Sequence, residues 1–435
     1  MAGSASNHWR ILAGLALGGV TGVVAHQFAS GSEGLRSAVT WLSDWVMHPL
    51  GQIFLRLLFL VVVPLVFAAL AASVARLGNG RSLGRMGVRV GLFFAVTMAF
   101  SVSMGLLAMN SLAPGQGFDA ATRDELLEAF QSDAASLRTG SAAAAATTPM
   151  AQVNLVLDMF LPRNMIGAIT EMRMLPLIVF AVLFGLGVGV QRPDRRESAC
   201  RMLDTVTDAM IRVVEMAMRL APYAVFALIF VATSRFGLAL LGKVGAFVGV
   251  VLGCYAVQLF AFYPVLVSLL VRRGPVDFLR RCIPVMATAF STSSSSATLP
   301  TSIEVCERDL GIRPSVASFV LPLGATVNMN GTALFEGCAV LFVAQVFGID
   351  LSLGQQAILV LLCVLSAVGV AGVPGGSLPL LMIVMAQVGV PAEGIALILG
   401  VDRLLDMGRT TVNVMGDVVA AAWVDRLEGA SDGAA

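Results

Sequence analysis

Charge is scarce in this sequence. Charged residues make up 13% of the 435-residue chain and apolar residues make up 57%, whereas a soluble domain has about 25% charged and about 45–50% apolar residues. This shortage argues against a soluble enzyme, a nucleic-acid-binding protein and a disordered scaffold. The net charge of +1 likewise predicts no basic surface for nucleic acid.

Histidine and cysteine are also sparse. The three histidines, His8, His26 and His48, lie far apart near the N-terminus, so neither a metal centre nor a Ser/His/Asp site is expected in the rest of the chain. The six cysteines occur singly, without the CxxC spacing of a metal or redox motif. We therefore expect no enzyme and no cofactor, with the cysteines acting as small packing residues.

Long apolar runs are what the chain has in abundance, and its mean hydropathy is +0.86. A membrane-spanning helix needs about 20 apolar residues, so the length allows roughly ten crossings. The sequence therefore predicts an all-α polytopic membrane protein. The continuous runs are approximately 11–29, 41–75, 87–113, 153–190, 206–232, 238–271, 315–347 and 394–424.

Arginines follow alternate runs, which predicts the orientation in the membrane. By the positive-inside rule, the N-terminus and these clusters lie in the cytoplasm. The chain's richness in arginine suggests a bacterial inner membrane. The three clusters are Arg76, Arg81, Arg85 and Arg89; Arg192, Arg195, Arg196 and Arg201; and Arg272, Arg273, Arg280 and Arg281.

Two further apolar segments are interrupted in their middle. Residues 276–310 contain AFSTSSSSATLP, and residues 354–389 contain VGVAGVPGGSLP. Each arm has about 15 residues and reaches roughly 22 Å as a helix, short of the ~30 Å hydrocarbon core. The pattern predicts two re-entrant hairpins, which are tolerated only where protein or water surrounds them. Paired broken elements indicate a transporter binding site near the membrane midplane.

The last apolar run carries a polar stripe. Asp402, Asp406, Arg409, Asn413 and Asp417 are 4, 3, 4 and 4 residues apart, so they share one helix face about 80° wide. Charges at the centre of a membrane helix cost about 2.5–3.5 kcal/mol each on insertion scales, so they indicate a solute path. The alternative is an internal ion pair between Asp406 and Arg409 that only holds helices together.

The stripe suits an acidic amino acid. Arg409 presents a planar fork for a carboxylate, and Asp406 could accept an ammonium group. Ser294, Ser295 and Ser296 at the first hairpin tip could bind the α-carboxylate beside a helix N-terminus, unless the serine run is only a flexible loop. The glycines of residues 369–376 would let the second tip act as a gate.

Four motifs together resemble the glutamate/aspartate transporter family of dicarboxylate/amino acid:cation symporters, which includes the excitatory amino-acid transporters. They are STSSSSATLP, LPLGATVNMNGTALFEG, AGVPGGS and GVDRLLDMGRTTVNVMGD. The resemblance implies a homotrimer of protomers with eight transmembrane helices, two re-entrant hairpins, inverted repeats and an elevator mechanism.

The resemblance also divides the chain into a scaffold and a moving transport domain. The implied segments are 1–86 (scaffold helices 1 and 2), 87–113 (helix 3), 114–152 (a mobile extracytoplasmic loop), 153–235 (scaffold helices 4 and 5), 236–275 (helix 6), 276–310 (hairpin 1), 311–349 (helix 7 with the NMNGT break), 350–391 (hairpin 2, the gate), 392–427 (helix 8) and 428–435 (a disordered tail).

The resemblance assigns site residues by motif. Arg409 matches the receptor of the side-chain carboxylate and Asp406 that of the amino group, which favours glutamate or aspartate as substrate. Further substrate contacts are Thr332, Thr410, Asn413, Ser294, Ser295, Ser296, Val373 and Ser377. One sodium site would use Gly324, Asn328, Asn413 and Asp417, and a second would use main-chain carbonyls around Thr326 and residues 367–370. This chain departs from the family in having Ser293 and Met407 where other members place a gating arginine, so we expect Arg403, one turn before Met407, to form a gating ion pair with Asp402 instead.

Two departures from the family concern the coupling ion. Asn330 replaces an aspartate of the third sodium site, and Met98 replaces a hydroxyl, although Thr97 beside it matches. Glu336 resembles the proton-carrying glutamate of animal members, unless Arg403 holds it permanently. We expect import driven by protons with little or no sodium, because Glu336 is present and the third sodium site is weakened; the retained Asp417 favours the alternative, sodium-coupled symport. A second alternative is an anion-conducting, channel-like member. The expected partners are the small substrate, the lipid bilayer and further copies of the chain.

Overall fold

The computed structural model describes residues 2–29, 32–77, 81–117, 161, 164–170, 174–368 and 377–432, and these ranges contain helices but no strand. The helices before residue 258 are α1 (Ala2–Ala29), α2 (Glu33–Leu42), η1 (Ser43–Met47), α3 (His48–Leu77), α4 (Arg81–Leu112), α7 (Met165–Thr170), α8 (Met174–Gly189) and α9 (Pro193–Val257). The later helices are η4 (Gln258–Phe262), α10 (Tyr263–Leu266), η5 (Val267–Val271), α11 (Pro275–Arg281), α12 (Ile283–Thr292), α13 (Ser295–Arg308), α14 (Pro314–Val327), α15 (Asn330–Val346), α16 (Leu353–Val368), α17 (Leu378–Gln387), η6 (Ala392–Ile395) and α18 (Ala396–Asp432).

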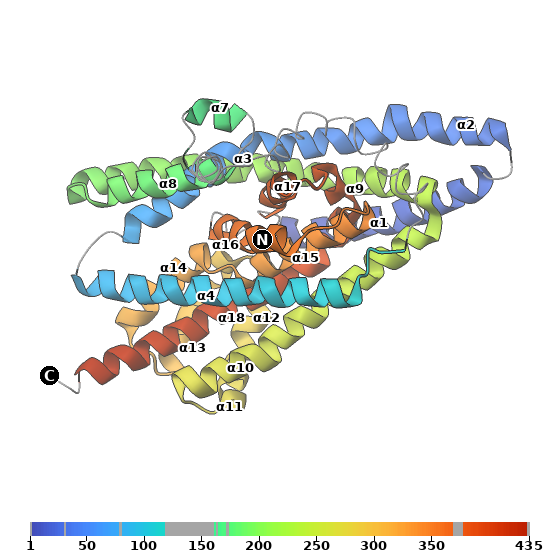
Figure 1. Cartoon of the computed structure of the whole chain (residues 1–435). Coiled ribbons are helices and arrows are strands. Elements are labelled where there is room, and N and C mark those ends of the chain that lie inside the picture. The colour runs from blue at the N-terminus through green and yellow to red at the C-terminus, as the bar shows by residue number, and fades with distance from the viewer. Residues whose placement is uncertain are drawn as a thin grey trace.

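The helices form two packed groups that α9 connects. In Figure 1, α2, α3 and α8 lie in the upper part and α10 to α13 in the lower part, while α9 runs along the top and then descends to α10. α1 and α3 pack against α9, and α18 packs against α9, α12, α14 and α15. α18, which carries the predicted polar stripe, is therefore enclosed by other helices.

Three glycines allow α1 to approach α9 closely. Gly14, Gly18 and Gly22 are four residues apart, and a Cβ atom at Gly18 would lie only 2.5 Å from the carbonyl oxygen of Phe226. At Gly22 a Cβ atom would lie 1.9 Å from Oγ1 of Thr233. Small residues at this spacing let helix backbones meet where hydrophobic association is weak, as in a membrane.

α9 is longer than the sequence analysis predicted. We expected helix 5 to end near residue 235 and helix 6 to begin at 236, whereas α9 is helical from Pro193 to Val257. Residues 232–241 contain one glycine and no proline, so nothing in them forces a break. The helix bends by 50° between residues 193–217 and 219–234, near Pro222, which cannot donate a helical hydrogen bond.

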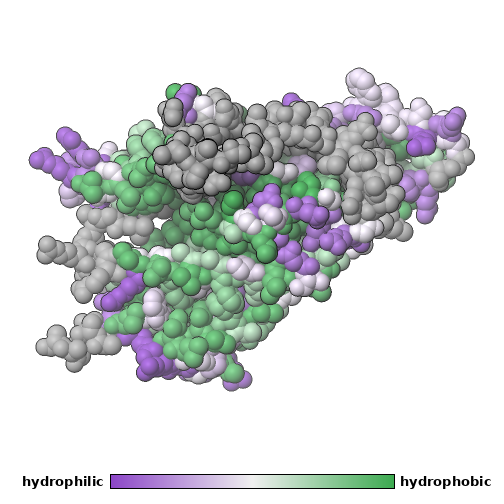
Figure 2. Space-filling model, in the orientation of Figure 1, coloured by the Kyte–Doolittle hydropathy of each residue, from purple (hydrophilic) through white to green (hydrophobic). Residues whose placement is uncertain are grey.

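Several helices have the length and apolar character of membrane spans. Met86–Leu112, Leu241–Val271 and Pro314–Val346 meet this criterion within the described part of the chain, and the bent pair Pro193–Ala217 and Arg219–Ser234 makes a fourth. Hydrophobic residues cover much of the face in Figure 2, and α4 exposes an apolar row of Val88, Leu92, Val96, Phe100 and Leu107. A polytopic membrane protein accounts for this surface.

The C-terminal third has two of the predicted interruptions within the described residues, one at the serine run and one in the NMNGT motif. α12 and α13 pack against each other across a break at Ser293, whose φ of 50° is left-handed, and Ser294, which caps α13 by accepting from the amide of Ala297. α14 and α15 are separated by Asn328 and Met329, within the NMNGT motif. α16 and α17 flank residues 369–376, so the predicted glycine-rich tip lies outside the described residues, as does the loop 114–152 apart from residues 114–117.

α18 continues to Asp432, although we expected a disordered tail from residue 428. Its last turns are fixed to three other elements. Glu428 pairs with Arg89 of α4 at 2.8 Å, Asp425 accepts from Arg313 at 2.8 Å, and Arg426 donates to the carbonyl of Leu270 at 2.5 Å. These contacts offset the entropy that fraying would gain.

Candidate functional site

The polar stripe of α18 is buried, as its periodicity predicted. Asp402, Asp406, Arg409, Asn413 and Asp417 are each no more than 5% exposed. Because α18 is surrounded by α9, α12, α14 and α15, the stripe faces protein on several sides. The side chains nevertheless form three separate groups, each with its own partners.

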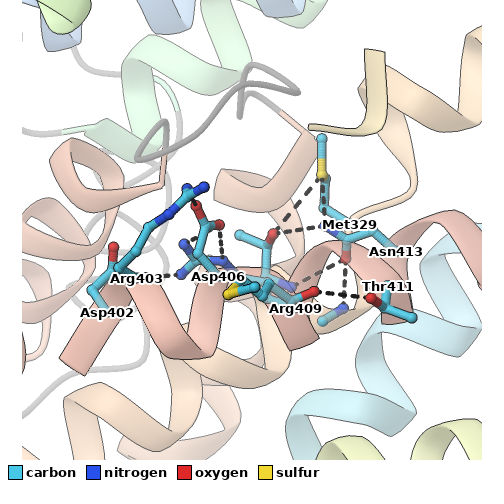
Figure 3. Close-up of polar contacts among 10 residues, drawn as sticks. Met329, Asp402, Arg403, Asp406, Arg409, Thr411 and Asn413 are labelled. Atoms are coloured by element: carbon cyan, nitrogen blue, oxygen red, sulfur yellow. Dashed lines mark hydrogen bonds and ion pairs between the residues drawn. The ribbon is translucent and has the colours of Figure 1, made fainter. Parts of the chain in front are cut away.

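The first group is a quartet of two acids and two arginines, defined here as Asp402, Arg403, Asp406 and Arg409. The Arg409 guanidinium donates to Asp406 Oδ1 from Nη2 at 2.5 Å and from Nε at 3.1 Å, and Nη1 donates to Asp402 Oδ1 at 3.2 Å. Arg403 Nη1 donates to Asp406 Oδ2 at 3.2 Å. Figure 3 shows these side chains gathered along one stretch of α18.

The quartet contains the Asp406–Arg409 ion pair that the sequence analysis considered as an alternative, but the described partner of Arg403 differs from the one we expected. We expected Arg403 to pair with Asp402, but the described bonds join Arg403 to Asp406 and Asp402 to Arg409. All four residues belong to α18, and the described pairs join residues three or seven positions apart. The pairs among these four residues therefore join positions of one helix.

Phe335 of α15 completes the surroundings of Arg409. The centre of its ring lies 4.5 Å from Cζ of Arg409, and Phe335 is fully buried. An aromatic face attracts a cation without competing for its hydrogen bonds. The sequence analysis missed this contact because Phe335 resembles any core aromatic residue.

The second group centres on Asn413. Its Oδ1 accepts from the amides of Gly331 at 2.7 Å and Thr332 at 3.3 Å, and its Nδ2 donates to Thr332 Oγ1 at 3.1 Å and to Met329 Sδ at 3.2 Å. Figure 3 shows Met329 beside Asn413. This group fixes the start of α15 to α18, and it brings together the predicted substrate residues Asn413 and Thr332. Met329 was not predicted.

The third group surrounds Asp417, whose Oδ1 accepts from Asn328 Nδ2 at 2.8 Å. A Cβ atom at Gly324 would lie 2.4 Å from the same oxygen, so glycine is needed for this approach. Asn328 Oδ1 is buried without a hydrogen-bond partner among the described residues. Oxygen atoms are the ligands that a hard cation prefers. This group brings together Gly324, Asn328 and Asp417, three of the residues predicted for a sodium site, which stays a prediction. Asn413 belongs to the second group, and Thr326 bonds to Leu323 in its own helix.

Asn330 and Glu336 are both on α15 and belong to none of these three groups. Asn330 Nδ2 donates to Tyr263 Oη at 3.0 Å, and its Oδ1 has no partner in the described structure. Glu336 accepts from the Ser366 hydroxyl, an interaction that was not predicted. No described bond joins Glu336 to Arg403, the alternative considered from sequence. Thr97 bonds to Phe93 within α4, and Met98 is in the core.

The hairpin residues are placed as follows. Ser294 and Ser295 are buried, whereas Ser296 is exposed. Ser377, next to α17, is buried with a hydroxyl that has no described partner. Both α12 and α13 contact α18. Thr410 is buried on α18, and Val373 lies outside the described residues.

In a helical membrane protein, charged side chains buried beside interrupted helices are characteristic of a secondary transporter rather than an enzyme. The model of the sodium:dicarboxylate symporter family matches residues 8–427, so the chain belongs to that family.

Relatives whose names state a transport function match nearly the whole chain. A proton/sodium-glutamate symport protein of Bacillus subtilis (strain 168) is 36% identical, and a proton/glutamate-aspartate symporter of Escherichia coli (strain K12) is 34% identical; each match covers 97% of this chain and 92% of the relative. The C4-dicarboxylate transport protein 3 of Ralstonia nicotianae (strain ATCC BAA-1114 / GMI1000) is 32% identical, over 98% of this chain and 91% of its own length.

Proposed function

We propose that this protein is a symporter that imports glutamate and aspartate, coupled to protons, with reduced or no dependence on sodium. The observation that carries the proposal is the buried quartet, in which Arg409 is held between Asp402 and Asp406. The names of the Bacillus subtilis and Escherichia coli relatives support glutamate and aspartate as substrates.

The quartet suits a substrate that is both a zwitterion and an acid. With all four groups ionised, its two acids balance its two arginines. A substrate carboxylate that binds the Arg409 fork must take the place of carboxylate oxygens now bonded there. That exchange frees Asp406 to receive the substrate ammonium group, so a single molecule with both groups replaces the internal pairing.

The other predicted contacts would hold the rest of the substrate. Asn413, Thr332 and Thr410 lie on or beside α18, and Ser294, Ser295 and Ser377 bring buried hydroxyls from the two interrupted segments. The Ser377 hydroxyl is buried and has no partner in the described part of the chain, and such a hydroxyl costs free energy until it is hydrogen-bonded. A bound carboxylate or ammonium group would supply that bond.

Glu336 supports proton coupling. It is fully buried on α15 and has a single described hydrogen bond, from Ser366. Burial of a carboxylate away from water favours the neutral, protonated form. At the third sodium site, the neutral Asn330 stands where the family has a carboxylate, which weakens the attraction for a cation.

A sodium-coupled symporter is the second candidate. The group of Gly324, Asn328 and Asp417 favours it, because Asn328 Oδ1, which has no partner among the described residues, lies beside a carboxylate that a cation could share.

The transport mechanism and its setting are part of the same proposal. Family membership and the interrupted segments support eight transmembrane helices with two re-entrant hairpins, in a homotrimer that works by an elevator mechanism with the second hairpin as gate. The arginine clusters support a bacterial inner membrane location with a cytoplasmic N-terminus.

Uptake into liposomes under separated gradients tests the proposal. Labelled glutamate or aspartate is supplied with an inward proton gradient and no sodium, and then with a sodium gradient at equal pH. We expect uptake on the proton gradient alone, and we expect Glu336→Gln to abolish its dependence on that gradient. Unlabelled succinate lacks the amino group. It should compete poorly, because it offers no ammonium group to take the place of the arginine donors that now contact Asp406.

Other outcomes would redirect the proposal. Uptake only with sodium would establish the second candidate. Strong competition by succinate would assign the site to dicarboxylates without an amino group. Anion currents that persist without substrate flux would indicate a channel-like activity. Arg409→Lys separates the charge of Arg409 from its geometry, because lysine keeps the charge but lacks the bidentate fork.

A further inference from the structure

Glu336 and Ser366 form a buried polar contact between two helices. The hydroxyl of Ser366 on α16 donates to Glu336 Oε2 on α15, and the two residues are 3% and 0% exposed. The other carboxylate oxygen, Oε1, has no partner among the described residues. Ser366 is therefore the single described donor to a carboxyl group that is cut off from water.

Few other polar groups lie around Glu336 in the described part of the chain. Two other titratable groups interact electrostatically with the Glu336 carboxyl group: the guanidinium of Arg409 on α18 and the thiol of Cys363 on α16. The other helices packed against this part of α15 present mainly apolar groups. These are Val102 and Leu106 of α4, which face Gly337, and Phe247 and Cys254 of α9, which face Phe335 and Cys338.

The Ser366 hydroxyl has a second partner in its own helix, because it can also donate to the carbonyl oxygen of Cys363 at 3.2 Å. A hydroxyl has one proton to donate and lone pairs with which to accept. When Glu336 is ionised, Ser366 donates to it. When Glu336 carries a proton, its own O–H can donate to Ser366 Oγ, and Ser366 can turn its proton to Cys363.

We propose that Ser366 is a positioning residue for the coupled proton, and that it transmits the protonation state of Glu336 to α16 by reversing this hydrogen bond. The proton stays on Glu336 throughout, and no covalent bond to serine forms or breaks. α16 is the first arm of the proposed second hairpin, so the reversal links proton binding to this helix. This inference rests on the proposed proton coupling through Glu336.

The pH dependence of substrate affinity tests this role. In Ser366→Ala the ionised Glu336 loses its described donor, so protonation becomes easier and persists to higher pH. A hydrogen bond to a charged group is worth enough to shift the pH midpoint upward by about one unit or more. Ser366→Thr keeps a hydroxyl and should restore the midpoint. Ser302→Ala is the matched control, because the buried Ser302 hydroxyl donates to Thr298 in its own helix.

The variants distinguish the possible failures. In the Glu336→Gln background, Ser366→Ala should cause no further change in the pH profile. If Ser366→Ala leaves the midpoint unchanged while Glu336→Gln removes the pH dependence, the role of Ser366 is wrong and the proposed function stands. A loss of affinity that is equal at every pH also overturns the role, since it indicates packing alone. If Glu336→Gln keeps the normal pH dependence, proton coupling through Glu336 fails first. Ser366→Cys, with a weak donor, gives an intermediate shift if the alanine variant does not fold.

Discussion

The guanidinium carbon of Arg409 on α18 lies 4.5 Å from the centre of the Phe335 ring on α15, so the two helices are joined by a cation–π contact. Two carboxylates bind the edges of the guanidinium, and the aromatic ring covers one face. The guanidinium is thereby held in a fixed plane, which would lower the entropy lost if a substrate carboxylate binds there as proposed.

Phe335→Leu should weaken glutamate binding about two- to thirtyfold, because a desolvated cation–π contact is worth about 0.5–2 kcal/mol. Affinity is measured by competition for labelled glutamate uptake. Phe342→Leu is the control, since Phe342 is equally buried on α15 but stacks on Phe247 at 4.6 Å. Equal effects of the two substitutions would show that ring packing, and not the contact with Arg409, is responsible.

Gly324→Ala should lower uptake by about tenfold or more. The new Cβ would lie 2.4 Å from Asp417 Oδ1 and would push the carboxylate away from Asn328, and overpacking of this kind costs about 1–3 kcal/mol. Gly253→Ala on α9 is the control, because nothing lies within 4 Å of its Cβ position. Normal uptake and an unchanged response to sodium in Gly324→Ala would rule out a functional role for the close approach.

Asn330→Asp should introduce or increase stimulation of uptake by sodium. The Tyr263 hydroxyl already donates to the carbonyl of Val412 at 2.8 Å, so a new carboxylate at position 330 would lack a donor and would gain from a cation. Uptake is compared with and without sodium at constant pH. Asn330→Ala should show no such gain, and equal responses of both variants would contradict the prediction.

Gly18→Ala should destabilise the folded protein by about 1–3 kcal/mol, while Gly19→Ala should have little effect. At Gly18 the Cβ atom would meet the backbone oxygen of Phe226 at 2.5 Å, whereas at Gly19 the nearest atom is a Leu241 methyl at 3.6 Å. Thermal unfolding of the detergent-solubilised protein measures the difference. Identical melting temperatures would mean that α1 can shift away from α9 without cost.

Features with a local cause could be predicted from the sequence. The burial of Asp402, Asp406 and Arg409 on one face follows from helical periodicity, and the interruption at Ser293 and Ser294 follows from a run of serines between apolar arms. The prediction failed in the middle of α9, where we placed the boundary between two helices at residues 235 and 236 but no residue prevented the helix from continuing.

Features that depend on distant contacts could not be predicted. Ser366 is 30 residues from Glu336, and Met329 is 84 residues from Asn413. A serine and a methionine in apolar helices give no local signal of such partners. The stripe itself was visible, but its division into three groups depends on which residue of α14, α15 or α18 faces each polar side chain.

The quartet also bears on how the membrane voltage acts on the protein. Two acids and two arginines carry no net charge when all four are ionised, so an electric field then exerts no net force on the quartet. Each uncompensated charge that crosses 100 mV is worth about 2.3 kcal/mol. A bound acidic amino acid adds one negative charge, which an inside-negative potential repels. Uptake driven by that potential therefore requires more than one accompanying cation for each substrate molecule.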